Sequence, residues 1–200
     1  MNNIFSKSRV EAFSDGIFAI IITLLVLEIK VPHINDHNST NELMKSLLGL
    51  LPKFVGWIIS FFTIAVIWVN HHRIFKQIKQ FDSGIFWWNA VLLLWCTFIP
   101  FPTAVLGDYP DNQISIILYG TVMALMAASF SFMRLYLIRK PELLEDSVNQ
   151  VMFRKGTYFS VLFGPVMYLT AVALGFLHPY FAFMIFLGIP VYFIFSKTRN

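Results

Sequence analysis

Long apolar stretches alternate with short polar segments along the whole chain. A helix that crosses the hydrocarbon core of a bilayer needs about 20 mainly apolar residues, and six segments reach or approach that length. They are Val10–Ile29, Phe54–Asn70, Ile85–Leu106, Ile114–Ile138, Tyr158–Leu177 and Tyr180–Phe195. An earlier entry into the second segment, through residues 47–51 with Pro52 at its start, is the alternative there. The pattern predicts an all-α, polytopic membrane protein with six transmembrane helices.

The last two apolar segments are separated only by His178 and Pro179. Together they are about twice as long as a single crossing requires. We therefore expect a helical hairpin here and not one long kinked helix.

The composition agrees with a membrane protein. Of the 200 residues, 57% are hydrophobic and only 13% are charged, whereas a soluble domain carries about 25% charged residues. The largest polar segments, Pro32–Asn41 and Lys140–Lys155, are too short to be folded domains. We expect a single domain over residues 1–200, with no soluble catalytic module and no enzyme activity.

The lysines and arginines indicate the orientation, because cytoplasmic loops are enriched in these residues. If the N-terminus is cytoplasmic, twelve of the 15 fall inside and only Lys30, Lys45 and Lys53 fall outside. Such a bias predicts that both termini are cytoplasmic. The net charge of +4 comes from these short loop groups, so we do not expect nucleic-acid binding.

The first apolar segment begins with several charged and hydroxyl groups, Arg9-Val-Glu-Ala-Phe13-Ser14-Asp15. Charged residues at membrane depth are expensive and usually face a protein interior or water. Arg9 and Glu11 also fit an interfacial position, from which their side chains extend toward water. Asp15 is too short for that, so we expect it to have a partner.

An apolar stripe follows along the same helix. At about 100° per residue, Ile20, Leu24 and Leu27 lie within roughly 60° of one another, with Thr23 at the edge of the stripe. Asp15 points to a different side. Such a stripe is typical of contact with lipid or with other helices. It also fits a pore lining, in which apolar rings narrow the path and gate it by dewetting. The spacing alone leaves both interpretations open.

Further polar residues lie at the same expected depth as Ser14 and Asp15. Trp68, Asn70, His71 and His72 end the second apolar segment, and Trp88-Asn89 begins the third. Polar groups at one depth can satisfy each other's hydrogen bonds, which lowers the cost of burying them. Neighbouring histidines on a helix point about 100° apart and cannot easily share one ion. Because Cys96 is also the single cysteine, we expect no metal site and no cofactor.

These residues match a known pattern. The motif Arg9-x-x-x-Phe13-Ser14-Asp15 resembles the signature of the transmembrane protein 175 family of potassium channels. Supporting matches are Trp68-x-x-His71-His72-x-x-Phe75 and the pattern Asn89…Pro100-Phe-x-Thr103. The six crossings and the cytoplasmic termini agree with that family over the whole chain.

The resemblance implies a potassium-selective cation channel without a TVGYG filter, in which four identical chains surround a pore lined by the first helix. It makes Ile20 the tightest apolar ring, places further rings at Leu24 and Leu27, and gives Thr23 a contribution to selectivity. It also implies a network that braces the first helix, composed of Arg9, Phe13, Ser14, Asp15, Trp68 and one or other of His71 and His72. The partners would then be potassium ions, the lipid bilayer and three further copies of the chain. One six-helix unit per chain suggests the cell membrane of a bacterium or archaeon.

A secondary transporter with a midplane substrate site is the alternative function. Transporters often contain broken helices and internal repeats, and Pro100-Phe-Pro102 and Gly164-Pro165 are candidate breaks. The two halves of the chain show no convincing repeat, however, and the expected midplane lacks charged residues. A proton relay or intramembrane enzyme that uses Asp15 and His72 would require both groups to face a cavity.

Overall fold

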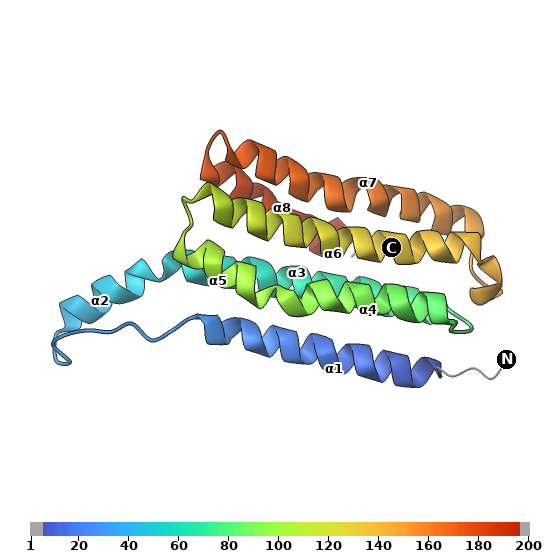
Figure 1. Ribbon diagram of the computed structural model, residues 1–200, viewed down its shortest axis with the longest axis horizontal. Helices are drawn as coiled ribbons and strands as arrows, with labels where there is room; N and C mark the ends of the chain where they lie inside the picture. The colour runs from blue at the N-terminus through green and yellow to red at the C-terminus, as the bar shows by residue number, and fades with distance from the viewer. Residues whose placement is uncertain (1–5, 197–200) are drawn as a thin grey trace.

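The computed structural model describes residues 6–196, which form an elongated helical bundle (Figure 1). The α-helices are α1 (Lys7–Leu25), α2 (Thr40–Gly49), α3 (Leu51–Lys76), α4 (Ser83–Phe98), α5 (Pro100–Asp108), α6 (Gln113–Arg139), α7 (Gln150–Gly175) and α8 (Pro179–Ser196). Two short 3-10 helices are η1 (Val26–Glu28) and η2 (Pro141–Leu143). The all-α prediction is confirmed for the described residues.

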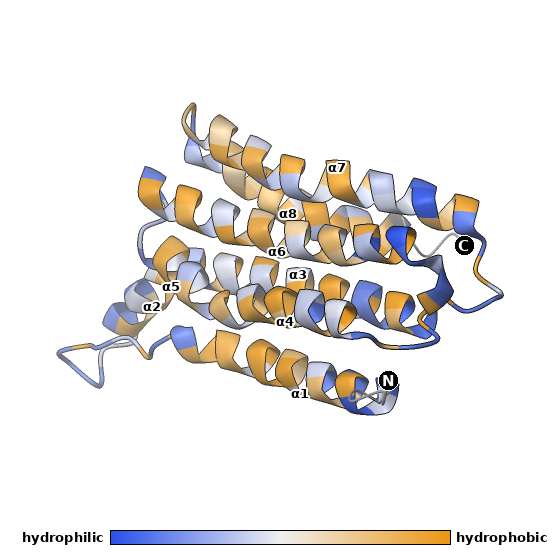
Figure 2. Ribbon diagram, turned by 45° about the vertical axis from the view of Figure 1, so that its right-hand side comes forward, coloured by the Kyte–Doolittle hydropathy of each residue, from blue (hydrophilic) through white to orange (hydrophobic). Residues whose placement is uncertain are grey.

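Five segments are long and apolar enough to cross a membrane, as judged over the described residues. They are Lys7–Glu28, Leu51–Lys76, Ser83–Asp108, Gln113–Arg139 and Gln150–Gly175. The sixth predicted crossing corresponds to α8, a shorter apolar helix over Pro179–Phe195. Hydrophilic residues gather toward the two ends of the bundle, as a membrane-spanning protein requires (Figure 2).

The two candidate helix breaks differ in the structure. α4 ends at Phe98 and α5 starts at Pro100, because a proline has no N–H to donate to the preceding turn. The two helices still form one continuous crossing. Pro165, in contrast, lies inside an uninterrupted α7. The second candidate break is therefore not a break in the structure.

α2 is an element that the sequence pattern did not predict. The alternative in which residues 47–51 lead directly into the second crossing does not describe this region, because residues 40–49 form a separate helix that projects from one end of the bundle (Figure 1). The Ser39 hydroxyl caps it by accepting a hydrogen bond from the Glu42 N–H at 3.3 Å. The Glu42 carboxylate in turn accepts hydrogen bonds from the backbone N–H groups of Asn35 and Asp36, which holds the preceding loop against the new helix.

α6 is the most buried crossing and packs between α4 and α7. Small residues allow this close packing, as is usual between membrane helices. A Cβ atom at Gly120 would lie only 2.3 Å from Cγ2 of Val172 on α7. A larger residue at Gly120 would require the Val172 side chain or the α7 helix that carries it to shift.

The end of the bundle that contains the start of α1 and the end of α6 is called the basic end below. Asp82 caps α4 there by accepting a hydrogen bond from the Ile85 N–H at 2.9 Å. Its carboxylate also accepts hydrogen bonds from the Tyr136 hydroxyl at 2.6 Å and from Lys140 Nζ at 2.8 Å. Partial burial raises the pKa of Asp82, but these hydrogen bonds outweigh it, so the pKa lies below the ordinary value of 3.8. This contact joins the start of α4 to the end of α6.

Candidate functional site: the two faces of helix α1

α1 lies at the edge of the bundle and packs against α3, α4 and α5 (Figure 1). Its buried residues recur every three or four positions and therefore occupy one helical face. They are Val10, Ser14, Phe18, Ile21 and Leu25. The other face of α1 has no partner among the described residues of this chain.

A buried chain of hydrogen bonds holds the inner face of α1. Asn89 of α4 donates from Nδ2 to the Ser14 hydroxyl oxygen at 2.9 Å. Its Oδ1 accepts from Nε2 of His71 on α3 at 2.8 Å, so the His71 ring carries its proton on Nε2. Ser14 in turn donates to the Val10 carbonyl at 2.8 Å. All three side chains are buried, and together they connect α1, α4 and α3.

Aromatic rings enclose the histidine of this network. The Phe18 ring meets the His71 ring edge-on at a centroid distance of 5.3 Å, and the Phe75 ring lies at 3.8 Å. Polar groups surrounded in this way lose their hydration, so each depends on its hydrogen-bonding partner. The structure thus places His71 in the buried network.

A second, exposed contact lies next to it. The Trp68 indole N–H donates to the Asp15 carboxylate at 2.8 Å, and the His72 ring stacks on the Trp68 ring at 6.0 Å. The expectation that Asp15 has a partner is met by Trp68. His71 and His72 therefore lie in different contacts, and α3 supplies both.

Two residues of the expected bracing network lie apart from these contacts. Arg9 and Phe13 are exposed on α1, and neither takes part in the hydrogen bonds that join α1 to α3 and α4 in the described part of the chain. Asn89, on the other hand, belongs to the centre of the network. The sequence marked it as a polar residue at the right depth and as part of the family pattern, but no pattern in α1 indicated that α4 would connect Ser14 with His71.

The apolar stripe lies on the exposed face. Ile20 is 58% exposed, Leu24 43% and Leu27 58%, although each is large and apolar. Thr23 lies on the same face, and its hydroxyl donates to the backbone carbonyls of Ala19 at 3.1 Å and Ile20 at 2.8 Å. Because the proton points to the backbone, the hydroxyl presents its oxygen lone pairs outward. This face is thus an apolar surface with one acceptor oxygen.

A second set of polar groups ties α3 to the break between α4 and α5. The Thr103 hydroxyl donates to the Ile99 carbonyl at 2.8 Å, so it accepts from Ser60 at 2.7 Å, and Ser60 accepts from Tyr119 at 3.0 Å. Pro at position 102 cannot donate to the helical ladder, and the hydroxyl bonds stabilise this irregular region. They fix the wall against which α1 packs.

No group of three or more histidine, cysteine, aspartate or glutamate side chains within residues 6–196 is arranged to hold a metal ion.

Comparison with known proteins gives consistent matches. The family model of the endosomal/lysosomal potassium channel TMEM175 matches residues 9–100, which include most of α1 and all of α2, α3 and α4. A potassium channel of Chamaesiphon minutus is 39% identical over 188 residues, covering 92% of both chains. A potassium channel of a Chryseobacterium species is 33% identical over 180 residues, covering 88% of this chain and 86% of the relative.

A solved structure gives the same match in three dimensions. The crystal structure of a lysosomal potassium-selective channel TMEM175 homologue from Chamaesiphon minutus superimposes with a TM-score of 0.83 at 36% identity. The match covers 97% of this chain and 98% of that one. The relatives are ion channels and not enzymes.

Proposed function

The chain belongs to the TMEM175 family of ion channels, and from that premise we propose that it conducts potassium through a pore lined by the exposed face of α1. It is a multi-pass membrane protein, and its relatives from Chamaesiphon minutus and a Chryseobacterium species are potassium channels by name. The observation that carries the proposal is the contrast between the two faces of α1. One face is held by a buried network, and the other leaves Ile20, Leu24 and Leu27 exposed, with no packing partner among residues 6–196.

A pore of this kind needs several copies of the chain, because each chain offers a single exposed α1 stripe. We propose a homotetramer in which four copies of α1 surround a central axis. The stripe suits that position because its three large side chains would form successive rings. At 1.5 Å per residue, the ring of Leu24 would lie about 6 Å from that of Ile20. Leu27 lies in η1, which continues α1 with a rise of about 2.0 Å per residue, so its ring would lie about 11 Å from that of Ile20.

Gating in this arrangement follows from dewetting. A narrow ring of isoleucine side chains has no group that replaces the hydration shell of an ion, so it blocks hydrated potassium when closed. A small outward movement of α1 admits water and then ions. The Thr23 oxygen, one turn of the helix from Ile20, offers a polar contact beside the constriction and is the proposed contributor to potassium selectivity.

The buried network would serve to brace α1 and not to touch the ion. Ser14 faces Asn89, and Asp15 faces Trp68, so both point toward the neighbouring helices. A rigidly held α1 keeps the stripe at a defined distance from the pore axis. Conduction would be passive, with both termini in the cytoplasm of a bacterial or archaeal cell and no cofactor beyond the permeant potassium ions.

The direct test is electrical. Purified protein in planar bilayers should give potassium currents with unitary steps, and Ile20→Asn should enlarge the current and lower potassium selectivity, because an amide wets the constriction. Leu169→Asn is the matched control, since Leu169 is 52% exposed on α7, away from α1. Currents that respond equally to both substitutions would contradict the assignment. Flux that saturates at transporter rates would favour a midplane substrate site instead.

A further inference from the structure

A crevice on the side of the bundle away from α1 is not used by the proposed pore. A cavity of about 300 Å³ lies between α3, α6, α7 and α8. Its wall is mostly apolar and aromatic, with contributions from Val66, Phe130, Phe159, Tyr168, Tyr192 and Phe193. The volume lies at the lower end of the range of about 300–1,000 Å³ found for small-molecule sites.

The crevice continues into a polar cavity at the basic end. This second cavity has a volume of about 650 Å³ and is lined by Arg73, Gln77, Ser147 and Asn149. Both cavities share Asn70 and Arg134, so the two spaces meet at these side chains. The crevice as a whole is therefore amphipathic, with an apolar interior and a cationic mouth.

Arg134 is the group that distinguishes this crevice. Its Nε donates to the Thr157 hydroxyl at 3.0 Å, one terminal nitrogen donates to the Phe153 carbonyl at 3.4 Å, and its guanidinium lies 4.9 Å from the Phe153 ring centroid. Gly156 gives it space, because a Cβ there would lie 3.2 Å from that terminal nitrogen. None of the ion pairs found within residues 6–196 includes Arg134.

A guanidinium within a membrane bundle normally pairs with an anion or lines a water-filled space. The remaining N–H groups of Arg134 form a fork that matches a phosphate. Arg73, which is exposed on α3, lines the same polar cavity. Two cations thus face one space without an acidic side chain in its lining.

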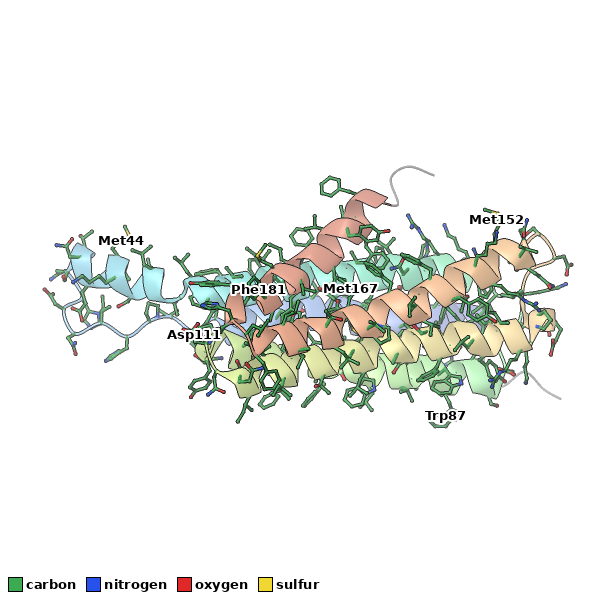
Figure 3. All side chains as sticks on the ribbon, turned by 90° about the horizontal axis from the view of Figure 1, so that it is seen from above. Met44, Trp87, Asp111, Met152, Met167 and Phe181 are labelled. Carbon is green, nitrogen blue, oxygen red and sulfur yellow. The ribbon has the colours of Figure 1, made fainter. Side chains whose placement is uncertain are left out.

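The crevice also opens to the outside of the bundle, where lipid chains lie. α8 starts beside α7 and diverges from it toward its C-terminal half (Figure 3). A third cavity of about 340 Å³ follows this opening between α3 and α8, lined by Phe62, Val66, Val69 and Ile194 together with Arg73. The apolar interior, the cationic mouth and the lateral opening are together complementary to an amphiphile with an anionic headgroup.

We propose that this crevice binds an anionic membrane lipid, with its headgroup phosphate at Arg134 and Arg73 and an acyl chain in the apolar cavity beside Val66. The lipid enters laterally between α3 and α8 from the leaflet at the basic end. By bridging α3, α6, α7 and α8, it stabilises the part of the bundle that lies behind α3. The site is separate from the α1 stripe and does not depend on the pore assignment.

Native mass spectrometry of the full chain in neutral detergent tests the proposal. The probes are phosphatidylglycerol, phosphatidylcholine with the same acyl chains, and inorganic phosphate. Phosphatidylglycerol should bind at least tenfold more tightly than phosphatidylcholine, because the two arginines of the mouth repel the choline ammonium that phosphatidylcholine carries beside its phosphate. Arg134→Gln should remove about tenfold of the affinity for phosphatidylglycerol, as expected for charge-assisted hydrogen bonds. Arg139→Gln is the control, since Arg139 is exposed on the same helix outside the crevice lining.

A second variant keeps the test valid if Arg134→Gln does not fold. Val66→Phe fills part of the apolar cavity with a larger side chain and leaves the charge unchanged. It should weaken the binding of both lipids, while the circular dichroism spectrum of the protein remains unchanged. Equal binding of the two lipids to the unsubstituted protein would overturn the proposal, as would equal effects of Arg134→Gln and Arg139→Gln. Binding of inorganic phosphate alone with the same dependence on Arg134 would show a free-anion site and overturn the lipid assignment.

Discussion

Replacing Asn89 with leucine removes both hydrogen bonds by which α4 holds α1 and α3. The substitution keeps the number and branching of the side-chain heavy atoms, so its main effect is the loss of the polar groups. It leaves the buried Nε2–H of His71 without an acceptor and Ser14 without its donor. A stranded buried donor costs about 1–3 kcal/mol, and interhelical hydrogen bonds in membranes contribute about 0.6 kcal/mol each.

These contributions sum to about 2–4 kcal/mol of lost stability. For a chain of this size, 1 kcal/mol lowers the unfolding midpoint by about 2–4 °C, so Asn89→Leu should lower it by about 4–16 °C. Thermal unfolding followed by tryptophan fluorescence in detergent measures the shift. Potassium flux into vesicles measures whether a loosened α1 changes conduction.

Thr97→Val is the matched control for this prediction. Thr97 also lies on α4, but its hydroxyl donates only to the Leu94 carbonyl of its own helix and is exposed. Its removal should shift the midpoint by less than about 2 °C. The Ser14→Ala and Asn89→Leu pair should be non-additive, because both changes break the same bond. Equal shifts for the two α4 variants, or additive effects of the pair, would refute the network.

Two further predictions concern the stripe and the basic end. Thr23→Val should leave the current largely intact but reduce the preference for potassium over sodium, measured as a shift in reversal potential under mixed ionic conditions; an unchanged reversal potential would exclude Thr23 from selectivity. Because the pKa of Asp82 is depressed in the folded state, its contact with Lys140 stabilises the fold fully above the ordinary pKa of 3.8 and is lost as the pH falls through the folded value. The unfolding midpoints of the unsubstituted protein and of Asp82→Asn should therefore differ at pH 7 and converge toward pH 2, and a constant difference would contradict this.

Much of the fold follows from the distribution of apolar residues. The transmembrane helices can be recognised in the sequence because lipid imposes a minimum apolar length on each one. α2 cannot be recognised in this way, since its apolar residues occupy little more than one turn and a half and lie beside a polar loop. These residues are Leu43, Met44, Leu47 and Leu48. Such a segment looks like the start of the next crossing until its own cap at Ser39 is seen.

In the candidate site, too, some residues could be predicted from the sequence and others could not. Helical periodicity separates Ile20, Leu24 and Leu27 from Asp15 without any tertiary information. The choice between His71 and His72 depends on where α1 and α4 lie around α3, and a single helix does not contain that information. Asn89 and Arg134 were not assigned a role for the same reason, because their partners come from distant segments of the chain.

The central claim, that the exposed stripe of α1 faces the ion path, is tested most directly by chemical access to one of its positions. Cys96 is the single native cysteine and is fully buried, so a thiol reagent should not modify the unsubstituted protein. Leu27→Cys should become sensitive to a charged, membrane-impermeant thiol reagent, and modification should reduce the potassium current in planar bilayers. Leu169→Cys on α7 should be insensitive. A current that persists after complete modification of Leu27→Cys would contradict the account.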